Sequence, residues 1–483
     1  MAITRTHPFF CFLLSSSLLL LFLLGSCNNY RLVEASGGQT ANNQHHHVIV
    51  VNSLIPASTC SPSLKGSSRS RTLQVVHKNG PCSPLDLQKK TRSYNLSQIL
   101  GQDEQRVRSI QSTISQQQLV EDSKAKIPAK SGRSFGTGNY VVTVGFGTPK
   151  RDLSVVFDTG SDLTWIQCQP CVVSCYQQTE PIFNPPTSST YSNISCGSAE
   201  CAQLKSATGN SPSCRSTCIY AIQYGDSSYS IGYFGRDTLS LTSSDVFPNF
   251  QFGCGQDNEG LFGSAAGLLG LGRHPVSLVS QSATKFGKKF SYCFPPVSSS
   301  TGFLAFGDQA GTSSSGVKYT SLLTDSRGPS FYFASLNGIS VGGQRLSIPT
   351  TVFTSSGTII DSGTVITRLP PAAYSALRSA FRQATSSYPS APSYSILDTC
   401  FNPGGQSTIR IPKIVLHFAG GVDLDVDASG IVILASSSQL CLAFAGNSSP
   451  SSVAILGNTQ QKTFEVVYDV AGGKLGFGAG GCS

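Results

Sequence analysis

The chain has 483 residues, of which 12% are charged, and a formal net charge of +9. This length exceeds one ordinary hydrophobic core and predicts two or more compact units. Residues 28–130 carry +7 of the charge and residues 131–483 only +1, so the larger part offers no obvious phosphate-binding patch.

The first residues resemble a targeting segment. Arg5 precedes an almost wholly apolar run from Phe9 to Leu24, which ends at Gly25-Ser26-Cys27. This pattern predicts a signal peptide over residues 1–27; an uncleaved anchor is the alternative, although the run is short for a membrane span. The chain ends without a hydrophobic tail, so a glycolipid anchor is not expected.

Residues 28–133 form a basic leader, for which we hypothesise a propeptide. Its cations would neutralise an acidic cleft at neutral pH, and Lys124, Lys126 and Lys130 are the candidates. A solvated linker is the alternative reading. Cys60 and Cys82 are candidates for a disulfide with each other.

A helix is expected from Leu96 to Leu119 within this leader. Apolar residues recur there at helical spacing, with Arg106 and Arg108 between them. The stripe comprises Ile99, Leu100, Val107, Ile110 and Ile114. Such amphipathic helices usually pack against a neighbouring element, so we do not expect this one to bind a membrane or nucleic acid.

The larger part of the chain contains one motif twice. Val156–Ser161 and Ile359–Thr364 each read as a buried strand leading into a tight turn, with Asp158 or Asp361 at the tip. Two such tips brought together would form a carboxylate pair that keeps one proton, and therefore holds an acid and a base at once. Two unrelated turns are the alternative for either motif alone.

Each motif is followed at comparable distance by a glycine among large aliphatic residues. The segments are Ala266–Gly272 and Ala454–Asn458. This recurrence predicts that the glycine backbone packs closely beside another strand, where a Cβ would not fit. Elsewhere, short alternating runs such as Thr238–Leu241 and Phe331–Leu336 indicate strands, and the best helix begins at Pro371.

Together these motifs resemble the pepsin-like aspartic proteases, and within them the nepenthesin-like plant branch, over roughly residues 140–483. The resemblance implies a mainly β, bilobal fold with a catalytic cleft between two pseudo-twofold-related lobes, residues 134–316 with a cysteine-rich insert and residues 317–483. Their connector is expected near Gly311–Gly316. Asp158 and Asp361 would be the catalytic dyad, presented by turns that contain Gly160 and Gly363.

The resemblance also assigns supporting residues. Thr159 and Ser362 would buttress the two loops, and Ser161 and Thr364 would hold the outer carboxylate oxygens. Residues 222–232 would form the hairpin that closes over the substrate. Its Tyr224 would meet the indole N–H of Trp165, the only tryptophan of the chain.

Twelve cysteines between Cys168 and Cys482 favour disulfides in an oxidising compartment. They are Cys168, Cys171, Cys175, Cys196, Cys201, Cys214, Cys218, Cys254, Cys293, Cys400, Cys441 and Cys482. Zinc ligation by the first three is the weaker reading, because no histidine lies nearby. The family resemblance implies the pairs Cys400–Cys441 and Cys293–Cys482. Asn95, Asn193 and Asn447 are candidate glycosylation sites.

The motifs of other hydrolases are missing, and no cofactor or metal is expected. The sequence therefore predicts a secreted, monomeric aspartic endopeptidase that hydrolyses proteins or peptides at acidic pH and has its own propeptide as inhibitor. The apoplast is the expected compartment, with vacuole or plastid as alternatives. Two other functions stay open: a non-catalytic inhibitor or binding protein of the same fold, and a protease whose basic precursor binds DNA. The DNA-binding reading rests on Val75–Pro84, which resembles plastid nucleoid relatives.

Overall fold

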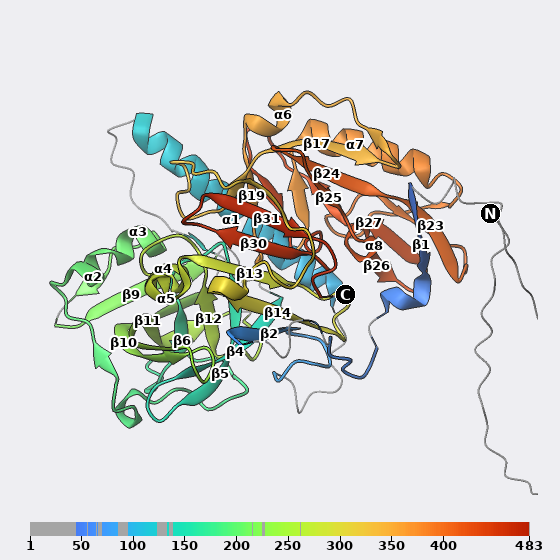
Figure 1. The fold of residues 1–483 in the computed structure, drawn as a ribbon. Coiled ribbons are helices and arrows are strands. Elements are labelled where there is room, and N and C mark those ends of the chain that lie inside the picture. Colours follow the sequence, from blue (N-terminus) through green and yellow to red (C-terminus); the bar gives the residue numbers. More distant parts are fainter. Residues whose placement is uncertain are drawn as a thin grey trace, which may run out of the picture. The chain divides into compact units, whose positions relative to one another are not determined.

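Strands dominate the fold (Figure 1). The computed structural model describes residues 45–55, 57–63, 65, 70–85, 95–122, 133–134, 139–214, 216–224, 228–260 and 262–482. The mainly β class predicted from the sequence is confirmed.

The two helices predicted from the sequence are present. α7 spans Pro371–Ala384, with proline in its first turn, and buries one face through Ala373, Leu377 and Phe381. α1 spans Leu96–Asp122. The shorter helices are α2 Ala199–Ala202, α3 Leu204–Thr208, α4 Leu278–Gln281, α5 Ala283–Phe286, α6 Thr351–Thr354, α8 Ala428–Ile431, and the 3-10 turns η1 Val51–Leu54, η2 Pro185–Thr187 and η3 Gly307–Gln309. In the part of the chain that the structure describes, no helix is long and apolar enough to cross a membrane.

Each half of the chain contains the same four-strand arrangement. In the first half, β5 runs parallel to β12, β12 antiparallel to β6, and β6 parallel to β11. In the second half, β19, β29, β20 and β28 follow one another with the same directions. The bounds are β5 Arg151–Asp158, β12 Gly267–Gly270, β6 Trp165–Gln167, β11 Val246–Glu259, β19 Thr358–Ile360, β29 Ala454–Leu456, β20 Thr367–Leu369 and β28 Phe444–Gly446. The repeat in the sequence is therefore a repeat of topology.

The repeated glycines lie where a side chain would not fit. A Cβ on Gly270 would lie 2.2 Å from the carbonyl oxygen of Asp162, and a Cβ on Gly457 would lie 2.7 Å from that of Val365. The predicted close approach of backbone to backbone is confirmed in both halves.

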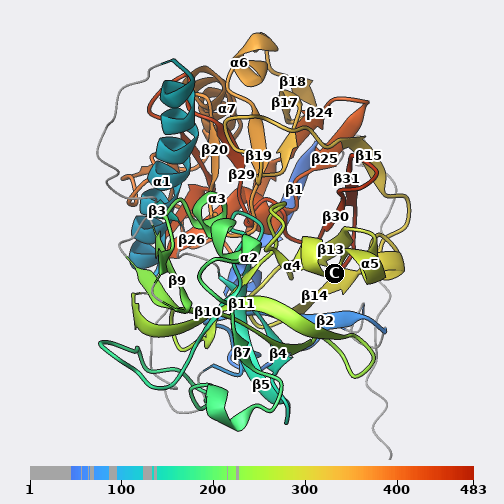
Figure 2. The same ribbon diagram turned by 90° about the vertical axis from the view of Figure 1, so that its left-hand side faces the viewer.

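Among the described residues, two strands of the leader, β2 and β1, join the sheets of the larger part, and the last leader residue begins a third, β3 (Arg133–Ser134), which pairs with β9 (Cys218–Tyr224). β2 (Thr72–His77) pairs with β14 (Thr301–Phe306) on one side and with β4 (Tyr140–Phe146) on the other. β1 (His46–Val50) pairs with β23 (Thr408–Pro412) of the second half (Figures 1 and 2).

Strands from the two halves also share one sheet, because β13 pairs with β30. The remaining bounds are β3 Arg133–Ser134, β7 Ser192–Asn193, β8 Ser213–Cys214, β9 Cys218–Tyr224, β10 Tyr229–Ser240, β13 Lys289–Cys293, β15 Lys318–Ser321, β16 Phe333–Ala334, β17 Leu336–Val341, β18 Gln344–Arg345, β21 Ser390–Ala391, β22 Cys400–Phe401, β24 Ile414–Phe418, β25 Val422–Asp425, β26 Val432–Ser436, β27 Gln439–Leu442, β30 Glu465–Asp469 and β31 Lys474–Gly478. Below the carboxylate turns, Phe157, Tyr292 and Tyr468 belong to one buried cluster that contains residues of both halves.

The cysteines of the described residues pair as disulfides. The pairs are Cys60–Cys82, Cys168–Cys254, Cys171–Cys175, Cys196–Cys214, Cys201–Cys218, Cys293–Cys482 and Cys400–Cys441. The three pairings expected from the sequence are confirmed, and the zinc reading of the first cysteines is wrong because each is bonded to another cysteine.

The sequon asparagines occupy different environments. Asn95 and Asn193 are exposed, and Asn95 Oδ1 accepts the N–H of Gln98 at the start of α1. Asn447 is half-buried, and its Nδ2 donates to the carbonyl oxygens of Ser452 and Val453. Glycosylation of all three remains a prediction.

Candidate active site

The two predicted aspartates lie at equivalent strand ends. Asp158 is the last residue of β5 and Asp361 directly follows β19; each is only 1% exposed. The N–H of Gly160 donates to Asp158 Oδ1 at 3.0 Å, and the N–H of Gly363 donates to Asp361 Oδ1 at 3.2 Å. Each turn therefore orients its own carboxylate in the same way.

Thr159 and Ser362 connect the two turns directly. The N–H of Thr159 donates to Ser362 Oγ at 3.0 Å, and the N–H of Ser362 donates to Thr159 Oγ1 at 2.9 Å. The two hydroxyls are 3.3 Å apart. This reciprocal arrangement holds the carboxylates in one place, as the sequence analysis expected.

The hydroxyl residues after the glycines differ. Thr364 Oγ1 donates to Asp361 Oδ2 at 2.5 Å, as expected. Ser161 Oγ is buried and makes no hydrogen bond within the described part of the chain, so the role expected for Ser161 is wrong in this structure. The outer oxygen of Asp158, Oδ2, instead accepts from Nη1 of Arg106 at 3.3 Å.

The predicted hairpin is formed by β9 and β10, which pair antiparallel with Gln223 opposite Tyr229. The turn residues 225–227 lie outside the described residues. Trp165 Nε1–H donates to the Tyr224 hydroxyl, as predicted, and the ring of Phe262 packs edge-on against both rings. Burial raises the pKa of Tyr224 well above its ordinary value, so its hydroxyl stays protonated.

A cation from the leader lies between the two aspartates. Arg106 of α1 is 1% exposed, and its Nη2 lies 2.7 Å from Asp158 Oδ1 and 2.8 Å from both oxygens of Asp361. Its Nε donates to Asp361 Oδ2 at 3.0 Å. A single guanidinium therefore contacts the whole carboxylate pair.

The turn glycines make room for this guanidinium. A Cβ on Gly363 would lie 2.2 Å from Arg106 Nη2, and a Cβ on Gly160 would lie 2.6 Å from it. Only backbone without a side chain allows the arginine, or any other reactant, to approach the carboxylates this closely.

The pKa values of Asp158 and Arg106 are set by burial and by the neighbouring charges. Burial raises the pKa of Asp158, the positive charge of Arg106 opposes that rise, and the neighbouring Asp361 adds to it. Burial alone would lower the pKa of Arg106, but the two carboxylates outweigh it and the pKa is raised. Arg106 is therefore a permanent cation here.

Arg106 is the functional residue that the sequence analysis missed. The lysines proposed to neutralise the cleft, Lys124, Lys126 and Lys130, lie outside the described residues. The available signal was the position of Arg106, four residues before Ile110 and seven after Ile99, on the apolar stripe itself. A cation on a buried helix face needs a carboxylate partner, because burying it unpaired is costly.

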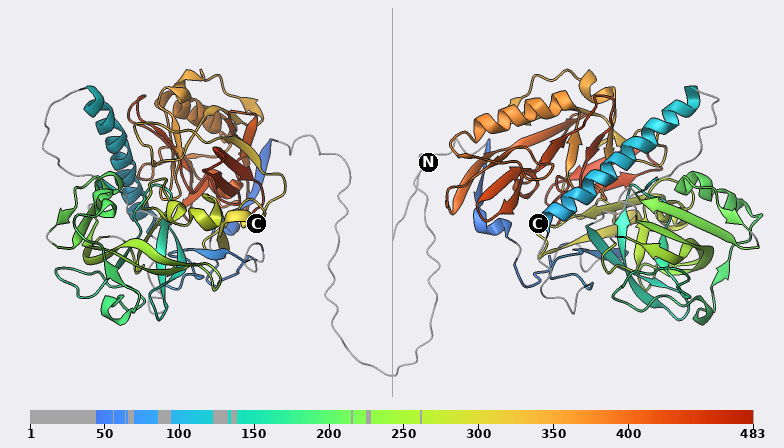
Figure 3. Two further views of the ribbon diagram at one scale, coloured as in Figure 1. Left: turned by 60° about the vertical axis from the view of Figure 1, so that its left-hand side comes forward. Right: turned by 180° about the vertical axis from the view of Figure 1, so that it is seen from behind.

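Further polar contacts hold α1 against the second half of the chain. The carboxylate of Asp103 accepts the N–H groups of Val365 and Ile366, and the side chain of Gln111 pairs with the backbone of Val453. Figure 3 (right) shows the cyan α1 running between the green strands of the first half and the orange and red strands of the second.

The site does not gather further ligands of the kind that metals need. Among the residues that the structure describes, no group of three histidine, cysteine, aspartate or glutamate side chains is placed to hold a metal ion.

Comparison with known proteins agrees with this geometry. Residues 140–308 match the family model described as xylanase inhibitor N-terminal, and residues 331–479 the model described as xylanase inhibitor C-terminal. An aspartyl protease family protein of Arabidopsis thaliana is 52% identical over 440 residues, covering 90% of this chain and 92% of the relative. Aspartic proteinase nepenthesin-2 of Nepenthes gracilis is 39% identical over 395 residues, covering 80% and 86%.

The fold is also found in a solved structure of low sequence identity. Basic 7S globulin from soybean superposes with a TM-score of 0.57 at 23% identity, covering 72% of this chain and 92% of the globulin. This likeness concerns the fold alone.

Proposed function

This chain belongs to the pepsin-like plant aspartyl protease family, and from that premise we propose that it is an endopeptidase in which Asp158 and Asp361 activate water to hydrolyse peptide bonds. The observation that carries the proposal is the pair of equivalent turns, tied to each other through Thr159 and Ser362, that presents both carboxylates to one nitrogen atom.

The chemistry follows from the closeness of the two carboxylates. Both carboxylates lie within 2.8 Å of one nitrogen atom of Arg106. With Arg106 absent, two carboxylates this close together favour a state in which they share one proton. The ionised carboxylate takes a proton from the attacking water, while the protonated one donates to the carbonyl oxygen of the substrate. By the family resemblance, Tyr224, whose hydroxyl accepts from Trp165, would close over the substrate. Because one carboxyl must stay protonated, cleavage is expected at acidic pH.

Cleavage of a denatured protein from pH 3 to 8 by acid-treated protein tests this function. Asp158→Asn and Asp361→Asn, which keep the shape of the site, should each abolish an acid-dependent activity. A substrate analogue with a tetrahedral hydroxyl in place of the scissile carbonyl should inhibit it. A folded protein that cleaves nothing at any pH would instead favour a binding or inhibitor role.

We also propose that α1 keeps the precursor inactive. Arg106 occupies the position at which water would be activated, and its guanidinium donates to the oxygens of both carboxylates, so neither water nor a substrate carbonyl group can reach them. The inhibitory leader proposed from the sequence thus acts through this arginine.

Activity of unprocessed precursors tests the inhibition. At pH 5, without acid treatment, Arg106→Gln should cleave protein substrates while the wild type stays inactive. Arg108→Gln is the matched control, because Arg108 lies on the same helix with its side chain 76% exposed. Equal inactivity of the Arg106 variant and the control would contradict the role given to Arg106.

For location we propose secretion, supported by the disulfides and the apolar N-terminus. A carboxy-terminally tagged chain should appear in the extracellular wash fluid of plant tissue. Accumulation in vacuoles or plastids would contradict this location.

A further inference from the structure

The helix α1 also places a carboxylate, that of Asp103, in a second set of hydrogen-bond donors beside the aspartate pair. Asp103, three residues before Arg106, is 0% exposed. Its Oδ1 accepts the N–H of Val365 at 2.6 Å, its Oδ2 accepts the N–H of Ile366 at 3.1 Å, and Nη2 of Arg368 lies 3.1 Å from the same Oδ2. Two backbone donors and one guanidinium therefore surround a single carboxylate.

The donors of this site belong to the second half of the chain, not to α1. Arg368 lies on β20 with its side chain 2% exposed, and its Nη1 donates to the carbonyl oxygen of Ile366 at 2.8 Å. Glu104 supplies a second carboxylate at 3.2 Å. Within the described residues, both carboxylates paired with Arg368 come from α1, so departure of the helix would leave the donors in place without an anion.

This site lies beside the carboxylate pair. Val365 directly follows Thr364, whose hydroxyl contacts Asp361. Asp103 and Arg106 are three positions apart in the helix, which is about 4.5 Å along the helix axis. An extended peptide advances about 3.3 Å per residue, so a substrate side chain within three residues of the cleaved bond would reach the same donors.

We propose that Arg368 and the N–H groups of Val365 and Ile366 form a subsite that binds an acidic side chain of the substrate, at the position that Asp103 occupies in the precursor. This inference rests on the proposed function of the cleft. A carboxylate fits these donors because it accepts two backbone hydrogen bonds and neutralises the guanidinium, whereas a carboxamide brings no charge and presents its own N–H donors.

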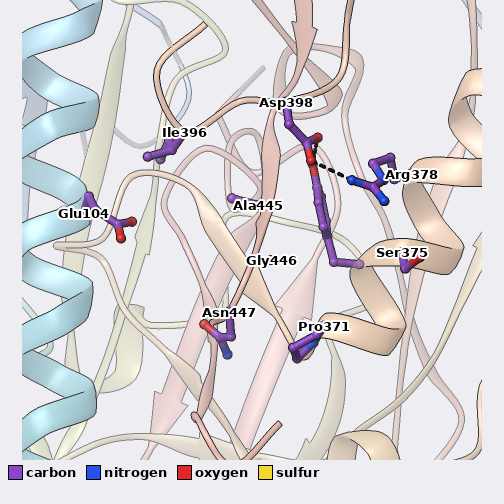
Figure 4. Close-up of a pocket in the computed structure, with 10 residues that line it drawn as sticks. Glu104, Pro371, Ser375, Arg378, Ile396, Asp398, Ala445, Gly446 and Asn447 are labelled. Atoms are coloured by element: carbon purple, nitrogen blue, oxygen red, sulfur yellow. Dashed lines mark hydrogen bonds and ion pairs between the residues drawn. The ribbon is translucent and has the colours of Figure 1, made fainter. Parts of the chain in front are cut away.

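A nearby arginine supplies the matched control. Beyond Glu104 lies a pocket of about 390 Å³, whose walls include Pro371, Ala445 and Asn447. Figure 4 shows Glu104 on α1 at one side of this pocket and Arg378 bonded to Asp398 at the other, at 2.8 Å. Arg378 keeps its carboxylate when α1 leaves and is therefore not expected to select acidic substrates.

The test uses protein from which α1 has been removed independently of its own activity. Protease sites introduced within residues 86–94 and 123–132 allow α1 to be excised, and mass spectrometry verifies its loss. The substrates are amidated peptides of one sequence, in which glutamate or glutamine occupies each of the three positions on either side of the cleaved bond. The readout is the ratio of kcat/KM between each glutamate peptide and its glutamine partner, for the wild type, Arg368→Gln and Arg378→Gln.

At one position the wild type should prefer glutamate about tenfold or more, as expected for hydrogen bonds to a charged group. The preference should grow between pH 3.5 and 5.5, because glutamate ionises near pH 4.3. It should fall close to one in Arg368→Gln and persist in Arg378→Gln. A ratio near one at every position, or a preference that survives in Arg368→Gln, would overturn the inference while leaving the proposed function intact.

If no peptide is cleaved, the proposed function fails. The affinity of the peptides for the protein then tests whether the subsite exists. Fluorescence anisotropy of the same labelled peptides with the excised protein gives the affinity of each pair. Tighter binding of a glutamate peptide that depends on Arg368 supports the subsite. Equal affinities, or no binding, overturn it.

Discussion

Two segments of the leader, β2 and α1, are held by the rest of the chain in different ways. β2 is held through its backbone, which pairs with β14 over Thr72–Val76 and with β4 at Val76 and His77. α1 is held through its side chains, and its buried charges Arg106 and Asp103 bind the aspartate pair and the donors beside it.

These two kinds of contact indicate different roles: β2 supports the fold, and α1 would control access to the aspartate pair. Backbone pairing inside a sheet depends little on which side chain stands at each position, so β2 behaves as part of the scaffold. The contacts of α1 use the groups that would perform catalysis, so under the proposed function the same contacts that bind the helix would also block the site. Three perturbations should affect one segment and spare the other.

The largest expected effect is that of Arg106→Gln on α1. Removing one partner of a buried ion pair typically costs 3–5 kcal/mol, and here the aspartate pair can take up a proton in compensation, so we expect α1 to be destabilised by about 3 kcal/mol. At pH 7 the amide protection of α1 should fall about a hundredfold. Hydrogen exchange followed by mass spectrometry measures α1 and β2 in the same sample.

The control for this measurement is again Arg108→Gln, whose exposed ion pair with Glu104 should contribute about 0.5 kcal/mol or less. Protection of β2 should stay unchanged in both variants. A parallel loss of protection in β2 and α1 would show that the leader is released as a single unit, which would contradict separate attachment of the two segments.

A smaller effect is expected at β2 when the pH falls. Burial lowers the pKa of His77 from 6.5 to about 3, with Lys78 and Lys462 adding to the shift. The folded state therefore binds fewer protons than the unfolded state between these values, so the stability of the β2 pairing is complete above pH 6.5 and is lost as the pH falls toward 3. Between pH 6.5 and 5 the loss should be about 2 kcal/mol.

His77→Gln removes this titration and should make the stability of β2 nearly independent of pH over the same range. Protection factors, corrected for intrinsic exchange rates at each pH, provide the measurement, and the amides of β12 serve as the internal reference. An equal pH dependence in wild type and variant would assign the acid sensitivity of β2 to other groups.

The sequence predicts the symmetric part of the site well, because each half contains the same short motif of a buried strand followed by an aspartate in a tight turn. The pairing of Asp158 with Asp361 follows from the repeated motif, whereas the Thr159–Ser362 bridge and the contact between Trp165 and Tyr224 were implied by the family resemblance. The helix α1 was also predicted, since its stripe of apolar residues is local information.

What could not be predicted is the contact between distant segments. Arg106 and Asp361 lie 255 positions apart in the sequence. The apolar stripe indicates that Arg106 is buried, but it does not show that the partner of this arginine is the aspartate pair. Ser161 failed for a related reason: the outer oxygen of Asp158 that the hydroxyl was expected to hold is contacted by Arg106 instead. Charge counting directed attention to the lysines at the end of the leader rather than to one arginine within an apolar stripe.

The smallest expected effect tests whether uncharged contacts also hold α1. Gln111 Nε2 donates to the carbonyl oxygen of Val453 at 2.7 Å, and its Oε1 accepts the N–H of Val453 at 2.8 Å. Because released groups regain hydrogen bonds to water, Gln111→Ala should weaken the docking of α1 by only about 1 kcal/mol, or roughly fivefold in protection. Gln105→Ala, at an exposed position of the same helix, should change protection little. If Gln111→Ala weakened the docking of α1 as much as Arg106→Gln, the charges at the aspartate pair would not be the main attachment of α1, and release of the helix would not depend chiefly on its contacts with Asp158 and Asp361.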